Sequence, residues 1–159
     1  MDRLRCFLMG HRDAPETVFS SLRDVIEKHI VQEGVTEFLI GRYGAFDCMA
    51  AEAVKQLKHS HPGVVLTLLL PYHPGERKVE LPEGFDGSLY PVGQETVPKQ
   101  LAILRANRYA VEQSGYLIAY AWQPGSNTRK LVEWACRRAR KGKFKHLVSC
   151  CLIIIGQKL

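Results

Sequence analysis

The chain has 159 residues, of which 46% are hydrophobic and 24% are charged, and its formal net charge at pH 7 is +6. This composition is typical of a folded globular protein, and the length suits a single domain over residues 1–159. No apolar run approaches the roughly 20 residues that a helix needs to span a bilayer, so we expect no membrane partner.

Cysteine and histidine usage bears on compartment and on metals. The five cysteines include no Cys-x-x-Cys pair, so we expect buried, reduced thiols. The apolar stretch at residues 4–9 is too short for a signal peptide, and we therefore expect a cytoplasmic protein. The histidines lack zinc-type spacing, so we expect no metal.

Apolar runs alternate with segments of helical periodicity along the chain. This alternation favours an α/β fold: a single Rossmann-like, doubly wound, mainly parallel sheet flanked by helices. The helix expected at residues 98–114 has Leu101, Ile103 and Leu104 among its apolar residues. Strands are predicted at 4–9, 36–40, 64–70, 88–92, 116–122 and 144–155, and helices at 16–32, 45–59, 98–114 and 127–140.

Three of the predicted strands end in a small, polar, glycine-bearing turn that leads into a helix. The first N–H groups of a helix have no internal partner, and the helix dipole favours negative charge there. Ligands of open α/β sheets bind at the carboxyl ends of the strands. We therefore expect the three turns to line one crevice that accepts an anion.

The first turn contains Gly10, His11 and Arg12. The glycine lets the backbone approach a ligand, and Arg12 has the geometry to hold a phosphate or carboxylate through two parallel hydrogen bonds. His11 is a candidate hydrogen-bond donor or acid. The alternative is a plain turn in which Asp13 caps the next helix.

The second turn contains Gly41, Tyr43, Gly44 and Asp47. Its two glycines resemble half of a dinucleotide fingerprint, but the full G-x-G-x-x-G pattern is absent, so we expect no nicotinamide or other cofactor. Asp47 either caps the helix or contacts a ribose hydroxyl or other polar ligand group, and it is the one candidate catalytic residue. Tyr43 either stacks on a base or lies on the surface.

The third turn contains Gly125, Ser126, Asn127 and Thr128, and it is the most phosphate-like of the three. Small residues leave room for a ligand, and the hydroxyl and amide side chains add to the free N–H groups. The alternative is ordinary helix capping by Ser126 or Asn127.

Two features outside the turns concern partners. The basic stretch 129–145 is either a solvated helix face and exit loop or a docking surface for nucleic acid. The apolar run 151–155 extends the last strand or pairs at an edge, which makes a homo-oligomer possible.

These motifs together resemble the SLOG superfamily, the Rossmann-like group that joins the DprA/Smf proteins with the cytokinin-activating LOG enzymes. The resemblance is greatest to its small stand-alone branch, the DUF1273 or YpsA-like proteins. It covers residues 4–149 and rests on the order and spacing of five motifs. These are the GHR turn at 10–12, the GxxGxxD turn at 41–47, Pro71-Tyr72 after the third strand, Asn107-Arg108-Tyr109, and the strand leading into PGSNT at 124–128.

The resemblance implies a nucleotide or nucleotide-derived ligand at these turns. The LOG enzymes cleave N-glycosidic bonds with a PGGxGTxxE signature, in which the glutamate follows the threonine by three residues. Here that position is Leu131, and Glu133 points elsewhere on the helix. Binding or sensing without robust catalysis is therefore the first hypothesis. The alternatives are nucleotide N-glycosyl hydrolysis or transfer with Asp47 or Glu16 as the carboxylate, and DprA-like nucleic-acid binding.

Overall fold

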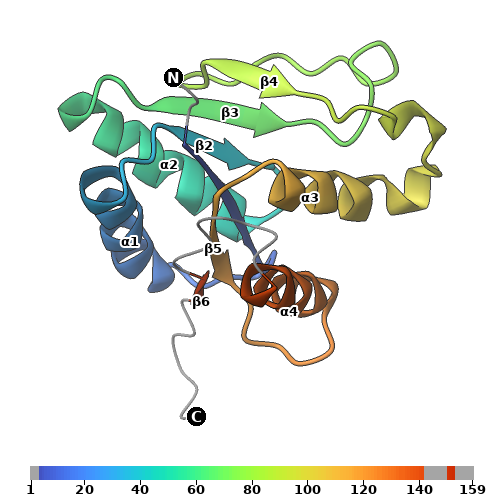
Figure 1. Ribbon diagram of the computed structural model, residues 1–159. Helices are drawn as coiled ribbons and strands as arrows, with labels where there is room; N and C mark the ends of the chain where they lie inside the picture. Colours follow the sequence, from blue (N-terminus) through green and yellow to red (C-terminus); the bar gives the residue numbers. More distant parts are fainter. Residues whose placement is uncertain (1–3, 142–149, 153–159) are drawn as a thin grey trace.

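The computed structural model describes residues 4–141 and 150–152. Its six strands form one sheet in the order β4-β3-β2-β1-β5-β6, and every neighbouring pair is parallel (Figure 1). The predicted parallel sheet is confirmed. The strands are β1 (Arg5–Gly10), β2 (Glu37–Ile40), β3 (Val65–Leu69), β4 (Gly87–Leu89), β5 (Tyr116–Tyr120) and β6 (Cys150–Leu152).

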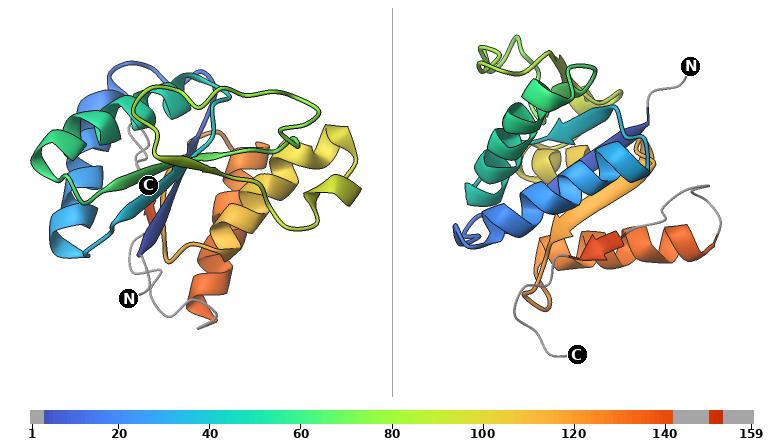
Figure 2. Two further views of the ribbon diagram at one scale, coloured as in Figure 1. Left: turned by 90° about the horizontal axis from the view of Figure 1, so that it is seen from above. Right: turned by 90° about the vertical axis from the view of Figure 1, so that its left-hand side faces the viewer.

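Helices cover both faces of the sheet, so the doubly wound architecture is also confirmed. Helices α1 and α2 pack on one face and α3 and α4 on the other (Figure 2). The α-helices are α1 (Val18–Gln32), α2 (Ala45–Ser60), α3 (Ala102–Glu112) and α4 (Asn127–Arg140), and two 3₁₀ turns, η1 (Gln94–Thr96) and η2 (Lys99–Leu101), precede α3.

The central strands are apolar on both sides because each of their faces is covered by helices. Phe38 and Ile40 of β2 point into the core under α1 and α2, whereas Leu39 points into the core under α3 and α4. Phe7 and Leu8 of β1 divide in the same way. The alternation follows from the two-residue period of a strand.

Helix α3 packs on the sheet through small residues. Ala102, Ala106 and Ala110 are buried, whereas Leu101 is 51% and Leu104 is 40% exposed. The large apolar residues of this segment therefore lie outside the core, although their helical periodicity suggests a core-facing role. An alanine face lets the helix approach the strands closely and leaves its larger apolar side chains free to line another surface.

The strand order places a topological switch point at β1. The chain proceeds from β1 outward through β2, β3 and β4 on one side, and then returns to β5 and β6 on the other. In open α/β sheets this reversal leaves a crevice outside the carboxyl ends of the strands, where ligands bind. The turns after β1, β2 and β5 all belong to that rim.

Helix α1 begins later than the sequence suggests. Its first residue is Val18, and Thr17 occupies the N-cap position without a side-chain cap bond. Asp13 does not cap it, so that alternative is wrong. A short turn separates Gly10 from the helix. Only two of the three expected helix N-termini, those of α2 and α4, therefore directly follow their glycine turns.

Three further expectations concern the last strand, the cysteines and membrane-spanning helices. Strand β6 pairs with β5 through Cys150–Leu152, and the rest of the predicted strand 144–155 lies outside the described residues. Among the cysteines whose side chains are described, Cys6 is buried but Cys48 is exposed, contrary to expectation. None of the described helices combines the length and the apolar character that a bilayer span requires.

Candidate functional site

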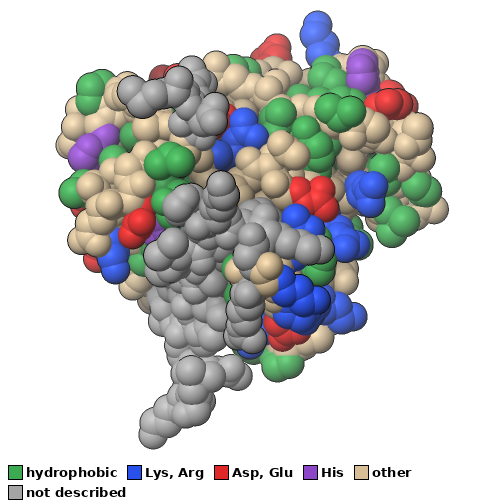
Figure 3. Space-filling model, in the orientation of Figure 1, with side chains coloured by type: hydrophobic (Ala, Val, Ile, Leu, Met, Phe, Trp, Pro, Cys, Tyr) green, Lys and Arg blue, Asp and Glu red, His purple; other side chains and the backbone are tan. Residues whose placement is uncertain are grey.

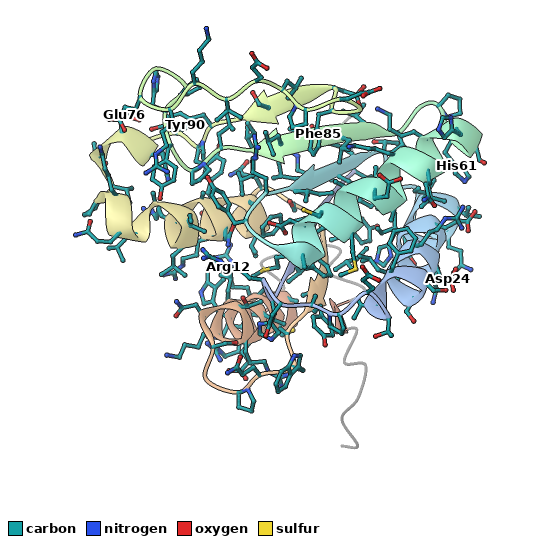
Figure 4. All side chains as sticks on the ribbon, turned by 180° about the vertical axis from the view of Figure 1, so that it is seen from behind. Arg12, Asp24, His61, Glu76, Phe85 and Tyr90 are labelled. Carbon is teal, nitrogen blue, oxygen red and sulfur yellow. The ribbon has the colours of Figure 1, made fainter. Side chains whose placement is uncertain are left out.

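A cavity of about 340 Å³ lies at the carboxyl ends of β1 and β2 and extends to α3 and α4. Each of the three predicted turns contributes to its wall. In Figure 4, Arg12 of the first turn lies near α4 and the beginning of α2. The predicted residues that line the cavity are Gly10, Arg12, Gly41, Tyr43, Asp47, Asn127 and Thr128.

The turn before α4 exposes unpaired backbone donors. Within the described part of the chain, the N–H groups of Asn127 and Thr128 form no hydrogen bond, and the first turn of α4 has no acidic residue. The partial positive charge of the helix dipole is therefore uncompensated where these residues enter the cavity. This turn has the chemistry of an anion site, as its sequence predicts.

Ser126 and Gly125 shape this turn without lining the cavity. The Ser126 hydroxyl accepts a hydrogen bond from the Arg129 N–H at 3.1 Å, so Ser126 is the helix cap. Gly125 has a φ of +73°, a conformation that other residues rarely adopt. For Ser126 the capping alternative is confirmed. Neither residue lines the cavity, and a ligand contact at either one stays a prediction.

The turn before α2 has the opposite electrostatic character. Asp47 lies in the first turn of α2, and its Oδ2 accepts a hydrogen bond from the Tyr43 N–H at 2.9 Å. The Ala45 N–H donates to the Arg12 carbonyl at 2.8 Å. A carboxylate of the chain itself therefore lies in the first turn of this helix and lines the cavity. Its negative charge disfavours an anion here, and the expectation that this turn binds one stays untested.

Burial sets the titration of Asp47. Desolvation raises its pKa from 3.8 to about 6, while the Tyr43 N–H bond and the positive charge of Arg12 act in the opposite direction. A carboxyl group with a raised pKa in a cavity is a candidate for a functional role. The arrangement offers a hydrogen-bond acceptor near neutral pH and a donor below it.

Several polar side chains of the cavity wall lack a partner. In the described chain no hydrogen bond or ion pair involves the side chain of Arg12, Gln100, Asn107 or Asn127. Arg12 thus acts on Asp47 through space without forming an ion pair with it. Unpaired groups that converge on one cavity are available to a ligand.

The apolar part of the wall comes from α3, α4 and β1. Ile103 and Leu104 of α3 and Leu131 of α4 line the cavity, together with Phe7, Leu8 and Met9 of β1. Leu131 holds the position where the LOG signature has its glutamate, so this wall is apolar where those enzymes have a carboxylate. Glu16 does not line the cavity, and Glu133 is paired with Arg129 at 3.1 Å. Among the described residues, Asp47 is the only carboxylate that lines it.

His11 belongs to the supporting structure instead of the wall. Its Nε2 accepts a hydrogen bond from the Gln123 N–H at 3.1 Å, and its ring packs edge-on against Tyr120 and Trp122. Burial lowers its pKa, although Asp13 opposes this shift. His11 does not line the cavity, so its expected contact with a ligand stays an untested prediction; its ring joins the loop after β1 to the loop after β5.

Gly44 is also absent from the wall, and its role is close packing. A Cβ atom at position 44 would lie 2.5 Å from the Cα of Arg12, and one at Gly10 would lie 2.4 Å from the Phe46 ring. Only glycine permits these approaches. Together they hold the first and second turns against each other.

The sequence reasoning missed Gln100, Ile103 and Leu104 as site residues. The sequence feature that could have identified them is the separation of two kinds of apolar residue on α3. The alanines form one stripe of the helix, and the larger apolar residues form another. Asn107, from the Asn107-Arg108-Tyr109 motif, does line the cavity.

Basic side chains gather over α4 on the face that Figure 3 shows. Arg129 is occupied internally, since it pairs with Glu133 and donates to the Ala121 carbonyl at 2.9 Å. The guanidinium groups of Arg108 and Arg138 lie over the Trp134 ring at 4.6 and 4.8 Å. Part of the basic stretch, residues 142–145, lies outside the described residues.

The described residues contain no His, Cys, Asp and Glu group suited to a metal ion.

Neither a protein-family model nor a curated protein sequence matches this chain. Solved structures do resemble it in fold. DNA processing protein A (DprA) from Streptococcus pneumoniae has a TM-score of 0.61 and 17% identity, over 86% of this chain and 48% of that chain. This chain therefore spans about half the length of that protein.

Two further likenesses are to proteins that handle the molybdenum cofactor. The molybdenum cofactor binding protein from Rippkaea orientalis has a TM-score of 0.58 and 18% identity, over 87% of this chain and 74% of that one. The molybdenum cofactor carrier protein from Chlamydomonas reinhardtii has a TM-score of 0.55 and 18% identity, over 87% and 73%. These likenesses confirm the Rossmann-like fold, whereas membership of the SLOG superfamily and placement in its YpsA-like branch stay predictions.

Proposed function

We propose that the chain binds a small phosphorylated ligand, a nucleotide or a nucleotide derivative, in the crevice at the switch point of the sheet. One observation carries the proposal. A single cavity combines the open N-terminus of α4, the unpaired Arg12 guanidinium, the Asp47 carboxyl and an apolar wall. These are the groups that a phosphate, a hydroxyl or ring N–H, and a base require.

The phosphate is assigned to the N-terminus of α4. The N–H groups of Asn127 and Thr128 and the Thr128 hydroxyl are donors, and the helix dipole adds a favourable field. Arg12 contributes a guanidinium on the opposite turn, with the planar geometry suited to phosphate oxygens. The N-terminus of α4 and the Arg12 turn therefore both favour a dianionic group in the cavity.

The rest of the ligand is assigned to Asp47 and to α3. The Asp47 carboxylate accepts from a ribose hydroxyl or a base N–H, and Ile103 and Leu104 provide an apolar surface for a base. The cavity volume of about 340 Å³ lies at the low end of ligand pockets, roughly 300–1,000 Å³. This volume favours a mononucleotide core over a complete dinucleotide.

The comparisons support small-molecule binding in a general way. Two proteins of similar fold are named for binding or carrying the molybdenum cofactor. At 18% identity the likeness concerns the fold, so the ligand of this chain is inferred from its own residues.

Calorimetry with the four nucleoside 5′-monophosphates tests the proposal. We expect micromolar to millimolar binding of at least one, and a loss of at least about tenfold in Thr128→Glu, because a carboxylate then occupies the phosphate position. Glutamate is favourable near a helix N-terminus, so the variant should remain folded. Lys28→Gln, on exposed α1 surface, is the control. Absence of binding at millimolar concentrations, or equal affinity in Thr128→Glu, contradicts the proposal.

A second candidate function is cleavage or transfer at the N-glycosidic bond of a nucleotide. The observation that favours it is the Asp47 carboxyl, whose raised pKa of about 6 suits proton transfer near neutral pH. Release of free base from nucleoside monophosphates, lost in Asp47→Asn even at saturating nucleotide, is the supporting result. Unchanged release in that variant removes Asp47 from the reaction.

Nucleic-acid binding is a third candidate, favoured by the fold likeness to DprA and by the basic surface of α4. It ranks lower because Trp134, the aromatic residue of that surface, is already covered by Arg108 and Arg138. Affinity for single-stranded DNA that falls steeply with salt is the expected sign of this function, and a flat salt response excludes it.

A further inference from the structure

A second group of basic residues lies beyond the crevice, at the carboxyl ends of β2 and β3. Arg42, Arg77 and Lys78 line an open cavity of about 690 Å³, together with Glu80 and Glu83. Arg42 belongs to the turn after β2, and the others to the loop between β3 and β4. All the basic side chains are exposed.

This outer cavity meets the crevice at the turn after β2. Arg42 lines the outer cavity, whereas its neighbour Tyr43 lines the crevice. Consecutive residues of one turn therefore belong to the two cavities. A ligand held in the crevice has the outer cavity on the far side of this turn.

The arginines of this boundary are positioned but unpaired. The Arg77 guanidinium lies 4.0 Å from the centre of the Tyr72 ring, a cation–π contact that holds its direction. In the described chain no salt bridge involves Arg12, Arg42 or Arg77. Their guanidinium groups are therefore not engaged in an ion pair of the described chain, although Glu80 and Glu83 line the same cavity as Arg42 and Arg77.

Electrostatics place the same three guanidinium groups around Tyr43. Burial and Tyr72 raise the pKa of the Tyr43 hydroxyl, and Arg77, Arg42 and Arg12 act against them. No described carboxylate contributes to this shift. The charged side chains that act on the Tyr43 hydroxyl are therefore all arginines.

We propose that Arg42 and Arg77 form a second anion subsite, so that the ligand is a nucleotide with a second phosphate group. This inference rests on the proposed function, because the first phosphate must occupy the α4 site. Guanidinium groups on two separate turns, one of them fixed on an aromatic ring, suit the oxygens of that second phosphate. Lys78 adds a further positive charge at its outer side.

Calorimetry that compares nucleotides with one and two phosphates tests the subsite. The probes are AMP, ADP and adenosine 3′,5′-bisphosphate, with GMP and GDP as a second base, all without divalent metal. We expect one of the two-phosphate forms to bind at least about tenfold tighter than its monophosphate, the effect of one added charge-assisted contact. ADP and the bisphosphate distinguish a neighbouring second phosphate from a distant one.

Variants assign the gain to these residues. The measured quantity is the ratio of the affinity for the two-phosphate nucleotide to that for its monophosphate. In Arg77→Gln and in Arg42→Gln/Arg77→Gln we expect this ratio to fall toward one, while monophosphate affinity and unfolding temperature stay unchanged. Arg105→Gln, an exposed residue of α3 outside both cavities, is the matched control and should keep the preference.

The outcomes separate this inference from the proposed function. If monophosphates bind and a second phosphate adds nothing, or if the double variant keeps the preference, the subsite is overturned and the crevice stands. If no nucleotide of either kind binds, both are overturned.

Discussion

The turns before α2 and before α4 look alike in sequence and differ in charge. Each follows a buried strand, contains glycine and small or polar residues, and opens a helix at the same rim of the sheet. The α4 turn leaves the N–H groups of Asn127 and Thr128 unpaired. In the α2 turn the Asp47 carboxylate lines the cavity and accepts a hydrogen bond from the Tyr43 N–H.

This difference explains how one cavity can recognise two ends of a ligand. A helix N-terminus without an acidic residue attracts an anion, whereas one that carries its own carboxylate attracts a hydrogen-bond donor. A nucleotide has both features, a phosphate at one end and hydroxyl or ring N–H groups at the other. Each prediction below alters one side of this contrast, beginning with the largest expected effect.

Replacing Gly44 should disrupt the α2 turn as a whole. In Gly44→Ala the new Cβ meets the Cα of Arg12 at 2.5 Å, and backbone on both sides must move. We expect a loss of about 3 kcal/mol in the free energy of unfolding, the upper range for overpacking. Urea denaturation measures it. Gly63→Ala, whose Cβ has nothing within 4 Å, is the control, and equal stability of the two variants would contradict the close approach.

Neutralising Asp47 should stabilise the protein at high pH. The folded-state pKa is raised from 3.8 to about 6, so the favourable contribution of the protonated group is complete below 3.8 and is lost as pH rises through 6. Asp47→Asn should therefore be more stable than the parent by about 3 kcal/mol at pH 8 and nearly equal to it at pH 3.5. The Asn side chain can still accept the Tyr43 N–H.

The comparison is made by urea denaturation at the two pH values, with Asp13→Asn as the control. Asp13 is exposed and does not cap α1, so its variant should show no such pH dependence. A loss of stability in Asp47→Asn at pH 8 would mean that the ionised carboxylate stabilises the turn, and that our description of it is wrong.

Protonating His11 should loosen the connection between the loops after β1 and β5. Burial lowers its pKa below 6.5, so the stability that depends on the neutral ring is present above pH 6.5 and is lost as pH falls through the lowered value. The loss should reach about 1–2 kcal/mol, because the Gln123 N–H then faces a second donor. In His11→Phe this part of the pH dependence should disappear, and in the exposed control His59→Phe it should remain.

Removing the cap of α4 should have the smallest effect on stability. Ser126→Ala deletes the acceptor for the Arg129 N–H, which typically costs about 1 kcal/mol. Thermal unfolding measures this loss of stability. The control is Ser20→Ala, at an exposed serine of α1. A change within the error of that control would show that the α4 turn does not depend on Ser126.

The elements of the fold could be predicted well because their signals are local. The predicted helix at 127–140 matches α4 (Asn127–Arg140), and the buried strands follow from short apolar runs. The late start of α1 could not be predicted, because Pro15 fits a first helical turn as well as the turn that precedes one.

The site was predicted less completely because its details depend on contacts between distant segments. His11 received a ligand role because its partner, the Gln123 N–H, is remote in sequence. Ile103 and Leu104 have the periodicity of core residues, and only the packing of the alanine face shows that they line the cavity. The direction of the Asp47 side chain separates the two turns, and no sequence pattern specifies it.

The account depends most directly on the backbone amides of α4, and nuclear magnetic resonance can observe them. An amide spectrum of the labelled chain should be recorded during titration with AMP, GMP, CMP and UMP. We predict that the amide signals of Asn127 and Thr128 shift most with the bound nucleotide, while that of Ala45, already bonded to Arg12, shifts little. Saturating shifts confined to other surfaces, or no shifts with any of the four, would contradict the central claim that α4 receives the phosphate.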